Sequence, residues 1–461
     1  MRRSEAIPST LDLSRCRAAV EAANPITVHG RITRVTGLIA EAKGPAARIG
    51  SICSISPGPG RSDILAEVVG FRDDRVLLMP FEEIRGIAPG NPVVAQSGSA
   101  DVGVGRDLVG RVLDGLGNPI DGDGPVAVER RYPLYADPVN PISRSRIVEP
   151  LDLGIRSVNG LLTVGRGQRM GIFAGSGVGK SVLLGMIAKT SRADVNVVAL
   201  VGERGRELND FLDRDLGEQG RRKSVIVVAT SDQPPLIRLR AAFLATSIAE
   251  FFRDQGRQVL LMMDSLTRFA MARREVGLAA GEPPTMKGYT PSVFTLLPRL
   301  LERAGTSAGD GGITGLYTVL VEGDDMNDPI ADTVRSILDG HIVLSRELAM
   351  QNHYPAIDVL GSISRLMNDI AGPDHQTLAG RLKEILATYK NAEDLIQIGA
   401  YKPGSNQKID YAIGMKEPID AFLKQGRDET VNLQESIRQL QDLLNSFPDS
   451  SPNRSHERTR Q

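Results

Sequence analysis

The chain has 461 residues, and its 55 Lys and Arg residues nearly balance its 56 Asp and Glu residues, which gives a formal net charge of −1. The 41% of hydrophobic residues is typical of a globular protein and excludes wholesale disorder, and the length suggests roughly two to four domains. Neutral charge, few aromatic residues and no Trp disfavour a nucleic-acid partner. No apolar run approaches the roughly 20 residues that span a bilayer, and the N-terminus has no apolar signal region, so we expect a cytoplasmic protein.

The first part of the chain predicts a short helix followed by a small β-barrel. Residues 1–24 have apolar side chains at helical spacing and end before Pro25, which disfavours continuation of a helix. Residues 25–95 alternate short β-branched runs with Gly and Pro turns, a pattern typical of a small closed barrel.

The rest of the chain predicts an α/β domain and a helical domain. Between residues 96 and 375, apolar segments alternate with helical patterns, which indicates a parallel sheet covered by helices on both faces. The expected strands are 169–174, 196–201, 224–229, 258–263 and 315–321. Residues 376–445 predict helices, and residues 446–461 a polar, disordered tail. The first of these helices has an apolar face made of Leu378, Leu382, Ile385, Leu386 and Tyr389.

A phosphate-binding loop (P-loop) is the strongest functional signal. An apolar strand ends at Ala174, a glycine-rich loop follows, and a helix begins with Lys180 and Ser181. Backbone N–H groups of such a loop bind phosphate, the lysine neutralises the β/γ oxygens, and the serine hydroxyl suits Mg²⁺. The expected nucleotide-binding residues are Gly175, Ser176, Gly177, Val178, Gly179, Lys180 and Ser181. Ala174 replaces the usual first glycine and is small enough for the turn; the alternative is a glycine-rich turn without a ligand.

Two carboxylates follow other apolar strands of this domain. Asp264 follows the segment 258–263 and could support Mg²⁺ through a water molecule, or could cap the next helix. Glu203 follows the segment 196–201, at the sheet edge where ligands of open α/β folds bind, and could orient the attacking water. The alternative for Glu203 is a surface ion pair with Arg204.

Together these segments resemble the catalytic subunits of rotary-type hexameric ATPases, which include ATP synthase and the type III protein-export ATPases. The resemblance covers most of the chain and rests on GRVLDGLGNPIDG at 110–122, the P-loop, GER at 202–204, Asp264 and YPAID at 354–358. Within that group, the segments 264–275, 278–284, 321–329 and 335–346 are most similar to flagellum-specific export ATPases, although virulence-type secretion ATPases share many of them. The resemblance implies a RecA-like P-loop domain between a β-barrel and a helical domain, with ATP and Mg²⁺ as cofactors.

The resemblance also implies roles for individual residues. The expected catalytic residues are Lys180, Glu203, Arg204 and Arg365. Arg204 would reach the γ-phosphate, and Arg365, in GSISR at 361–365, would be an arginine finger that enters the neighbouring subunit's site. Tyr354 and Tyr401 would flank the adenine. The alternatives are a surface ion pair for Arg365 and a core position for either tyrosine.

The predicted function is ATP hydrolysis by a homohexameric ring that assists export of flagellar proteins. We expect the N-terminal segment to dock a regulatory stator-like protein. The C-terminal helices would face export-gate membrane proteins, chaperones and export substrates, with peripheral association at the cytoplasmic face of the inner membrane. The alternatives are a virulence-type secretion ATPase, a rotary ATP synthase subunit, a non-hydrolysing structural subunit and a hexameric nucleic-acid translocase. Glu203 argues against the structural subunit, and the aromatic-poor composition argues against the translocase.

Overall fold

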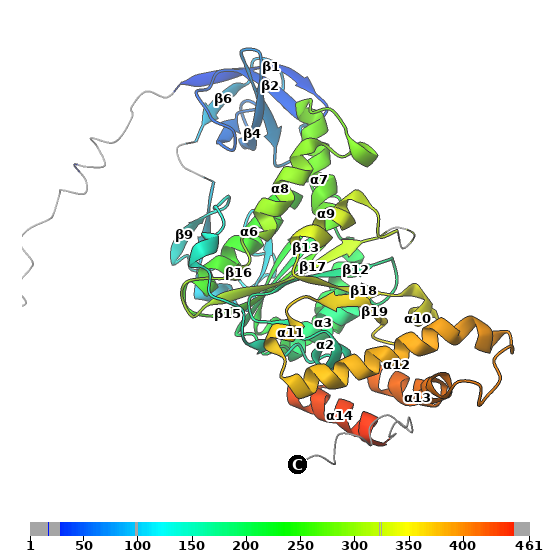
Figure 1. Ribbon diagram of the computed structural model, residues 1–461. Helices are drawn as coiled ribbons and strands as arrows, with labels where there is room; N and C mark the ends of the chain where they lie inside the picture. The colour runs from blue at the N-terminus through cyan, green and yellow to red at the C-terminus, as the bar shows by residue number, and fades with distance from the viewer. Residues whose placement is uncertain (1–16, 18–27, 97–99, 322, 324, 447–461) are drawn as a thin grey trace, which may run out of the picture. The chain divides into compact units, whose positions relative to one another are not determined.

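The computed structural model describes residues 17, 28–96, 100–321, 323 and 325–446. The chain divides into two compact units, Met1–Gly98 and Ser99–Gln461 (Figure 1). The helix predicted at 1–24 and nearly all of the tail predicted at 446–461 lie outside the described residues. Within the described ranges, no helix is long and apolar enough to cross a membrane.

The first unit contains a closed barrel of six antiparallel strands, which confirms the predicted β-barrel. The strands are β1 (His29–Thr36), β2 (Ile39–Lys43), β3 (Ile52–Ile55), β4 (Ile64–Arg72), β5 (Arg75–Pro80) and β6 (Pro92–Ala95). They pair in the order β1-β2-β5-β4-β3-β6, and β1 pairs with β6 to close the ring, so no strand edge is left open. β-Branched and small side chains such as Ile32, Ile55 and Val68 fill the interior.

The second unit is built around a mostly parallel sheet. Its strands are β7 (Asp101–Val104), β8 (Val112–Asp114), β9 (Arg130–Pro133), β10 (Pro150–Leu151), β11 (Val164–Gly165), β12 (Arg169–Ala174), β13 (Val195–Val201), β14 (Ser224–Ala229), β15 (Gln258–Asp264), β16 (Gly305–Thr306), β17 (Gly312–Leu320), β18 (Gly340–Leu344) and β19 (Ile357–Ser364). The main sheet has the order β19-β18-β12-β17-β15-β13-β14-β8, with β19 antiparallel at one edge. The five predicted strands are confirmed as β12, β13, β14, β15 and β17.

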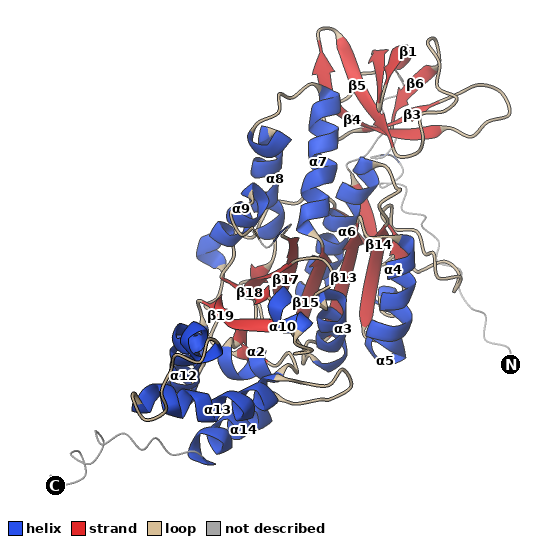
Figure 2. Cartoon of the chain, turned by 90° about the vertical axis from the view of Figure 1, so that its right-hand side faces the viewer, coloured by secondary structure: helices blue, strands red, loops and turns tan. Residues whose placement is uncertain are grey.

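Helices cover both faces of this sheet, as the continuous apolar strands predict (Figure 2). The helices are α2 (Arg156–Leu161), α3 (Lys180–Thr190), α4 (Gly205–Asp210), α5 (Gly217–Arg221), α6 (Pro235–Arg253), α7 (Leu266–Ala280), α8 (Pro291–Leu301), α9 (Pro329–Ile337), α10 (Arg346–Met350), α11 (Met367–Ile370), α12 (Pro373–Gln397), α13 (Gln407–Leu423) and α14 (Leu433–Ser446). Shorter turns are η1 (Arg106–Leu108), η2 (Pro141–Ser143), the π-helical η3 (Phe211–Leu216) and η4 (Met286–Gly288). Alternate strand residues face α3 on one side and α6 on the other, and Ile172 belongs to the core that includes Leu183 of α3.

The helices α12, α13 and α14 confirm the predicted helical C-terminal region. They pack on α2 and share one apolar core with α3 and the sheet, because Leu382, Ile419 and Leu440 join the buried cluster that contains Ile172. The predicted apolar face of α12 is also present: Leu382 and Ile385 are buried, and Leu378, Leu386 and Tyr389 pack against them. The C-terminal helices are therefore held against the same sheet that carries the P-loop.

Candidate active site

The P-loop has the conformation that its glycines allow. β12 ends at Ala174, and α3 begins at Lys180. Gly177 and Gly179 have φ angles of 79° and 91°, a left-handed region that side chains with a Cβ adopt at a cost. Ala174 is the last, buried residue of the strand and lies before the turn. This position explains why alanine is accepted where glycine is usual.

The other expected loop residues surround this turn. Gly175 and Val178 are buried, Ser176 is exposed, and Ser181 is half-buried in the first turn of α3. Val178 packs into the core below the loop, with 2% of its surface exposed, and so fixes the loop to the sheet. Ser176 and Gly177 are the exposed residues of the loop, and they lie just before the N-terminus of α3, a position that suits a phosphate group.

A buried cluster of one cation and two carboxylates lies beside the loop. Lys180 Nζ is 2.5 Å from Asp264 Oδ1 and 3.5 Å from Glu203 Oε1. The exposed fractions of the Lys180, Glu203 and Asp264 side chains are 11%, 15% and 5%. Burial opposes the charge of Lys180, but the two carboxylates outweigh it and raise the pKa of the lysine. Three residues from three elements, predicted separately, thus form one site.

Asp264 is held by a residue of the neighbouring strand. The Thr318 hydroxyl donates to Asp264 Oδ1 at 2.8 Å. Thr318 belongs to β17, which lies between the P-loop strand β12 and the Asp264 strand β15. Asp264 therefore reaches Lys180 across an intervening strand. The sequence did not indicate Thr318, because a lone threonine in an apolar strand carries no motif.

Glu203 is placed where a carboxylate binds protons unusually well. It follows β13 and the turn at Gly202, whose φ is 73°. Burial raises the pKa of Glu203 to about 7, the charge of Asp264 adds to the rise, and Lys180 opposes it. A carboxyl group with a pKa near neutrality is suited to act as a general base.

Arg268 of α7 is a neighbour that the sequence analysis did not single out. Its stem packs so closely on Gly202 that a Cβ at that glycine would lie 2.7 Å from Arg268 Cβ. Within the described part of the chain, the buried Nε of Arg268 has no hydrogen-bond partner. The close approach explains the need for glycine at position 202. It also places a guanidinium next to the Glu203 turn.

The two expected adenine contacts lie in different surroundings. A Cβ at Gly179 would lie 3.4 Å from the Tyr354 ring, so this half-exposed ring stands directly beside the P-loop. Tyr401 lies in the connection between α12 and α13, where its hydroxyl contacts the Asp410 carboxylate at 2.9 Å and the Asn406 carbonyl at 3.0 Å. The structure therefore brings Tyr354 to the loop, while the hydroxyl of Tyr401 is bonded to the connection and to the first turn of α13.

The two expected arginines also differ in position. Arg204 is the N-cap residue before α4, next to Glu203, but its side chain is 76% exposed and pairs with Glu207 at 3.6 Å. Arg365 follows Ser364, the last residue of β19, which pairs with Gly340 at the start of β18. The other end of β18, Leu344, pairs with Ala174 at the P-loop end of β12. At about 3.3 Å per residue along β18, Arg365 lies about 15 Å from the edge of the sheet that carries the P-loop. That edge is formed by the C-terminal ends of β12 and β18, and Arg365 lies at the edge formed by their N-terminal ends. It lies far from its own chain's cradle.

The donor set fits a magnesium nucleotide. Among the described residues, no cluster of three or more His, Cys, Asp or Glu side chains could hold a metal ion alone. Mg²⁺ in nucleotide sites is usually bound by one or two protein oxygens, with phosphates and waters supplying the rest. The Ser181 hydroxyl, next to Lys180 in the chain, and the Asp264 carboxylate, in contact with Lys180, could provide such oxygens.

Comparisons with known proteins agree with this geometry. Family models match the ATP synthase alpha/beta family, beta-barrel domain, at 32–96, the nucleotide-binding domain of that family at 154–364, and the T3SS EscN ATPase C-terminal domain at 371–442. The flagellum-specific ATP synthase of Bacillus subtilis is 56% identical over 90% of this chain and 95% of its own length. The chain belongs to the family of flagellum-specific ATP synthases and type 3 secretion system ATPases.

Other members of this family are similar over nearly the same length. The type 3 secretion system ATPase of Xanthomonas euvesicatoria is 48% identical over 92% of this chain and 95% of its own length. The structure of the assembled ATPase EscN from enteropathogenic E. coli has a TM-score of 0.85 and 48% identity, and covers 90% of this chain and 99% of EscN. A second EscN structure, in complex with its central stalk EscO, has a TM-score of 0.83. The resemblance predicted from the sequence is confirmed.

Proposed function

We propose that this chain hydrolyses ATP to ADP and phosphate in a ring-shaped assembly that assists export of flagellar proteins through the type III export apparatus. The observation that carries the proposal is the cluster of Lys180, Glu203 and Asp264 beside the P-loop. A site that only bound nucleotide would not need a buried carboxylate with a raised pKa next to the phosphate cradle.

The nucleotide would bind with its phosphates in the P-loop and its adenine beside Tyr354. Backbone N–H groups of residues 175–181 and the N-terminus of α3 would hold the phosphate oxygens. Lys180 would exchange its contacts with Asp264 and Glu203 for the β/γ oxygens, and this movement would release the two carboxylates for their own roles. Between the two predicted tyrosines, Tyr354 is supported by its contact with the loop.

The Ser181 hydroxyl and, through water, the Asp264 carboxylate would hold Mg²⁺, which would neutralise charge on the β- and γ-phosphates. Glu203 would accept a hydrogen bond from the attacking water and receive its proton as the water oxygen bonds to the γ-phosphorus. The bond from that phosphorus to the β–γ bridging oxygen breaks, and ADP leaves with the electron pair. Arg204 would swing from Glu207 to the γ-phosphate.

Arg365 would act on the nucleotide of a neighbouring copy. Its place at the edge of the sheet opposite the P-loop leaves it too far from its own cradle, whereas a guanidinium from a second subunit can stabilise the charge on the transferring phosphoryl group. This arrangement requires an oligomer in which each copy gives and receives an arginine. We propose a homohexameric ring.

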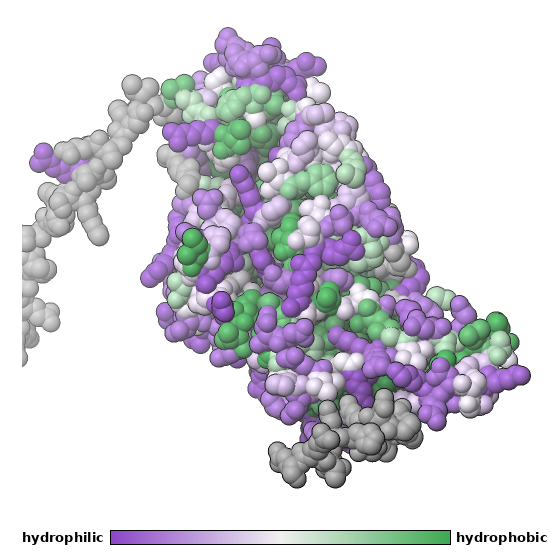
Figure 3. All heavy atoms as spheres, in the orientation of Figure 1, coloured by the Kyte–Doolittle hydropathy of each residue, from purple (hydrophilic) through white to green (hydrophobic). Residues whose placement is uncertain are grey.

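The export role would use the exposed surface of the C-terminal helices. Leu395 and Ile398, at the end of α12, are 49% and 75% exposed, where Figure 3 shows apolar side chains gathered. Such a surface suits contact with chaperones, export substrates or gate proteins at the cytoplasmic face of the inner membrane. A regulatory stator-like partner at the N-terminal segment belongs to the same proposal.

The Glu203→Gln variant tests the hydrolytic role. We expect turnover to fall by about 10²–10⁴-fold, because an amide cannot accept the proton, while binding of a fluorescent ADP analogue is retained. Asp210→Asn, in the helix that follows, is the matched control, since Asp210 is half-exposed and pairs only loosely with Arg214 at 3.8 Å. Wild-type turnover by Glu203→Gln would contradict the proposal.

The export role is tested in a strain that lacks this chain. Secreted flagellar protein would be measured in the culture supernatant after complementation with wild type, Glu203→Gln or Asp210→Asn. We expect wild type and Asp210→Asn to restore export. Unchanged flagellar export without the chain would overturn the flagellar role and favour a virulence-type system. The match of residues 371–442 to the T3SS EscN ATPase C-terminal domain is compatible with that alternative.

A further inference from the structure

The backbone at Arg365 is fixed to one residue of the neighbouring segment. The Arg365 N–H donates to the carbonyl of Asp339 at 3.0 Å, and Asp339 lies between α9 and β18. The Arg365 side chain is exposed, and its guanidinium donates a long hydrogen bond, at 3.4 Å, to the Arg335 carbonyl. The base of the arginine is thus anchored while its guanidinium faces outward.

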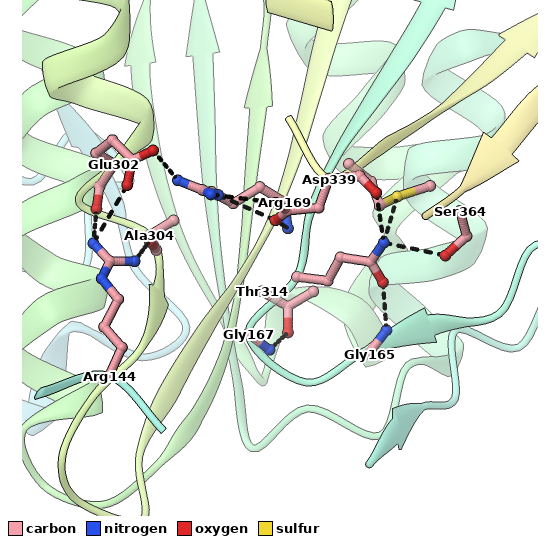
Figure 4. A network of polar contacts seen from close by, with 11 residues as sticks. Arg144, Gly165, Gly167, Arg169, Glu302, Ala304, Thr314, Asp339 and Ser364 are labelled. Carbon is pink, nitrogen blue, oxygen red and sulfur yellow. Dashed lines mark hydrogen bonds and ion pairs between the residues drawn. The ribbon is translucent and has the colours of Figure 1, made fainter. Parts of the chain in front are cut away.

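A buried amide reinforces this anchor on both sides. Gln168 Nε2 donates to the Asp339 carbonyl and to the Ser364 hydroxyl, each at 3.1 Å (Figure 4). The Ser364 hydroxyl in turn donates to the Thr163 carbonyl at 2.7 Å. Gln168 is completely buried, and its Oε1 accepts the Gly165 N–H at 2.8 Å. The orientation of the amide is therefore set by hydrogen bonds to the protein at both its oxygen and its nitrogen.

Asp339 is itself held by the first residue of the P-loop strand. Its carboxylate accepts the backbone N–H of Arg169 at 3.0 Å and two guanidinium N–H groups at 3.2 Å, and its own N–H donates to the Arg169 carbonyl at 2.9 Å. On its other side, the Arg169 guanidinium is 2.5 Å from Glu302, which Arg144 also contacts (Figure 4). Both Arg169 and Asp339 are mostly buried, so these charge-assisted contacts are geometrically restrictive.

We propose that Asp339, held by Arg169, is a positioning residue that sets where Arg365 stands relative to the neighbouring subunit's nucleotide. The inference rests on the proposed role of Arg365. Asp339 pairs with the end of β12 that lies away from the P-loop, so it would act only through the backbone of the arginine. A displacement of about 1 Å in a catalytic group can cost about 10²-fold in rate, so the anchor has a measurable consequence.

The same contacts connect one chain's P-loop to the arginine that it presents to its neighbour. Arg169 begins β12, and the P-loop begins where β12 ends, after six residues. A strand is stiff along its length, so a movement of its P-loop end would reach the Asp339 carboxylate at the other end. The anchor is thus a direct route from the site of one subunit to the site of the next.

The test is a double-mutant cycle between positions 339 and 365. Asp339→Asn keeps the shape of the side chain but removes its charge, and we expect kcat to fall by about 10-fold, with KM for ATP changed by less than about 2-fold. In an Arg365→Ala background, the same substitution has nothing left to position, so its effect on kcat should disappear. Glu302→Gln is the matched control, because Glu302 is the other acidic partner of Arg169 and contacts neither Asp339 nor Arg365 in the described network.

A second variant with a smaller structural change separates an effect on positioning from an effect on folding. Ser364→Ala removes only the hydroxyl between Gln168 and Thr163 and should lower kcat by a smaller factor, about 3-fold, again only when Arg365 is present. Thermal unfolding and ring assembly are measured for each variant. The positioning role would be overturned if Asp339→Asn lowered kcat by the same factor with and without Arg365. It would also be overturned if Glu302→Gln lowered kcat as much as Asp339→Asn does. Wild-type turnover by Arg365→Ala alone would instead contradict the proposed catalytic role of Arg365, and a positioning role for Asp339 would then have no basis.

Discussion

At the scale of single residues, Lys180 is the centre of the site. Without nucleotide it neutralises two carboxylates, and its 2.5 Å contact with Asp264 is the shorter of the two. Nucleotide phosphates would compete for the same ammonium group, because their charge is greater than that of either carboxylate. Lys180 thus offsets the charges of Asp264 and Glu203 until nucleotide phosphates displace the two carboxylates from its ammonium group.

The raised pKa of Glu203 predicts an acid limb in the pH profile of the free enzyme. Burial, and then the charge of Asp264, raise the pKa of Glu203 to about 7 from an ordinary value of about 4.3. Below that pH the carboxyl group is protonated and cannot accept the proton of the attacking water. We therefore expect kcat/KM to fall as the pH drops through 7, by about tenfold per unit, and to level off above it.

Steady-state ATPase measurements between about pH 5.5 and pH 8.5 check this expectation, because kcat/KM reports groups of the free enzyme. Binding of a fluorescent ADP analogue over the same range is the control, since ADP has no γ-phosphate for the attacking water and its binding does not require a proton to be transferred to Glu203. A flat kcat/KM profile would show that Glu203 stays ionised throughout.

The sequence predicts the residues of the site that belong to local motifs and misses those that depend on packing. Lys180 and Ser181 follow from the loop pattern, because glycine turns and a helix start are local features. Thr318 and Arg268 meet Asp264 and Gly202 only when separate strands and helices come together. Tyr401 was predicted from the resemblance alone, which carried no information on the hydrogen bond from its hydroxyl to Asp410 in the first turn of α13.

At the scale of elements, the position of α3 depends on a glycine. Gly185 lies in the middle of α3, and a Cβ there would be 2.5 Å from the carbonyl oxygen and 2.6 Å from the carbonyl carbon of Asp215 in η3. The backbone of η3 therefore packs directly on the helix that carries Lys180. Asp215 also pairs with Arg427 of the C-terminal region at 2.7 Å, so η3 is fixed from both sides.

Two glycine substitutions in helices should consequently have opposite signs. Gly185→Ala forces α3 away from η3, and we expect it to destabilise the second unit by about 1–3 kcal/mol. Gly380→Ala, in α12, meets no heavy atom within 4 Å and should stabilise its helix by about 0.5–1 kcal/mol, because alanine loses less backbone entropy. Urea unfolding followed by circular dichroism measures both changes. A stabilising Gly185→Ala would mean that η3 can move aside freely.

The fold could be predicted from the sequence where burial is continuous. The five central strands are apolar throughout, and their predicted positions agree with the structure to within three residues at each end. The short edge strand β8 has no such signal. The motif around it is stabilised by Asp121, which accepts two guanidinium hydrogen bonds from Arg111, at 2.7 and 2.8 Å, and one from the Val112 N–H at 2.8 Å. These contacts need the folded loop and have no periodicity in the chain.

At the scale of the whole molecule, the P-loop and Arg365 lie at opposite edges of one sheet, so a complete site needs two copies of the chain. Mixed rings test this arrangement. Arg365→Ala subunits keep Glu203, and Glu203→Gln subunits keep Arg365, so each variant alone should be nearly inactive. When the two are assembled together in equal amounts, about a quarter of the interfaces join an intact Glu203 to an intact Arg365. We expect ATP turnover in the mixture to exceed the sum of the separate activities many times over.

The matched control replaces one partner with the double variant Glu203→Gln/Arg365→Ala, which can form the same mixed rings. Mixed with Glu203→Gln subunits, it offers no intact Glu203, so no interface is complete and no turnover should appear. Subunits labelled with two fluorophores report co-assembly in every mixture by energy transfer. Turnover that stays at the sum of the parts, in rings shown to be mixed, would contradict an arginine supplied between subunits. Recovery confined to the first mixture can arise only if Arg365 completes the site of its neighbour.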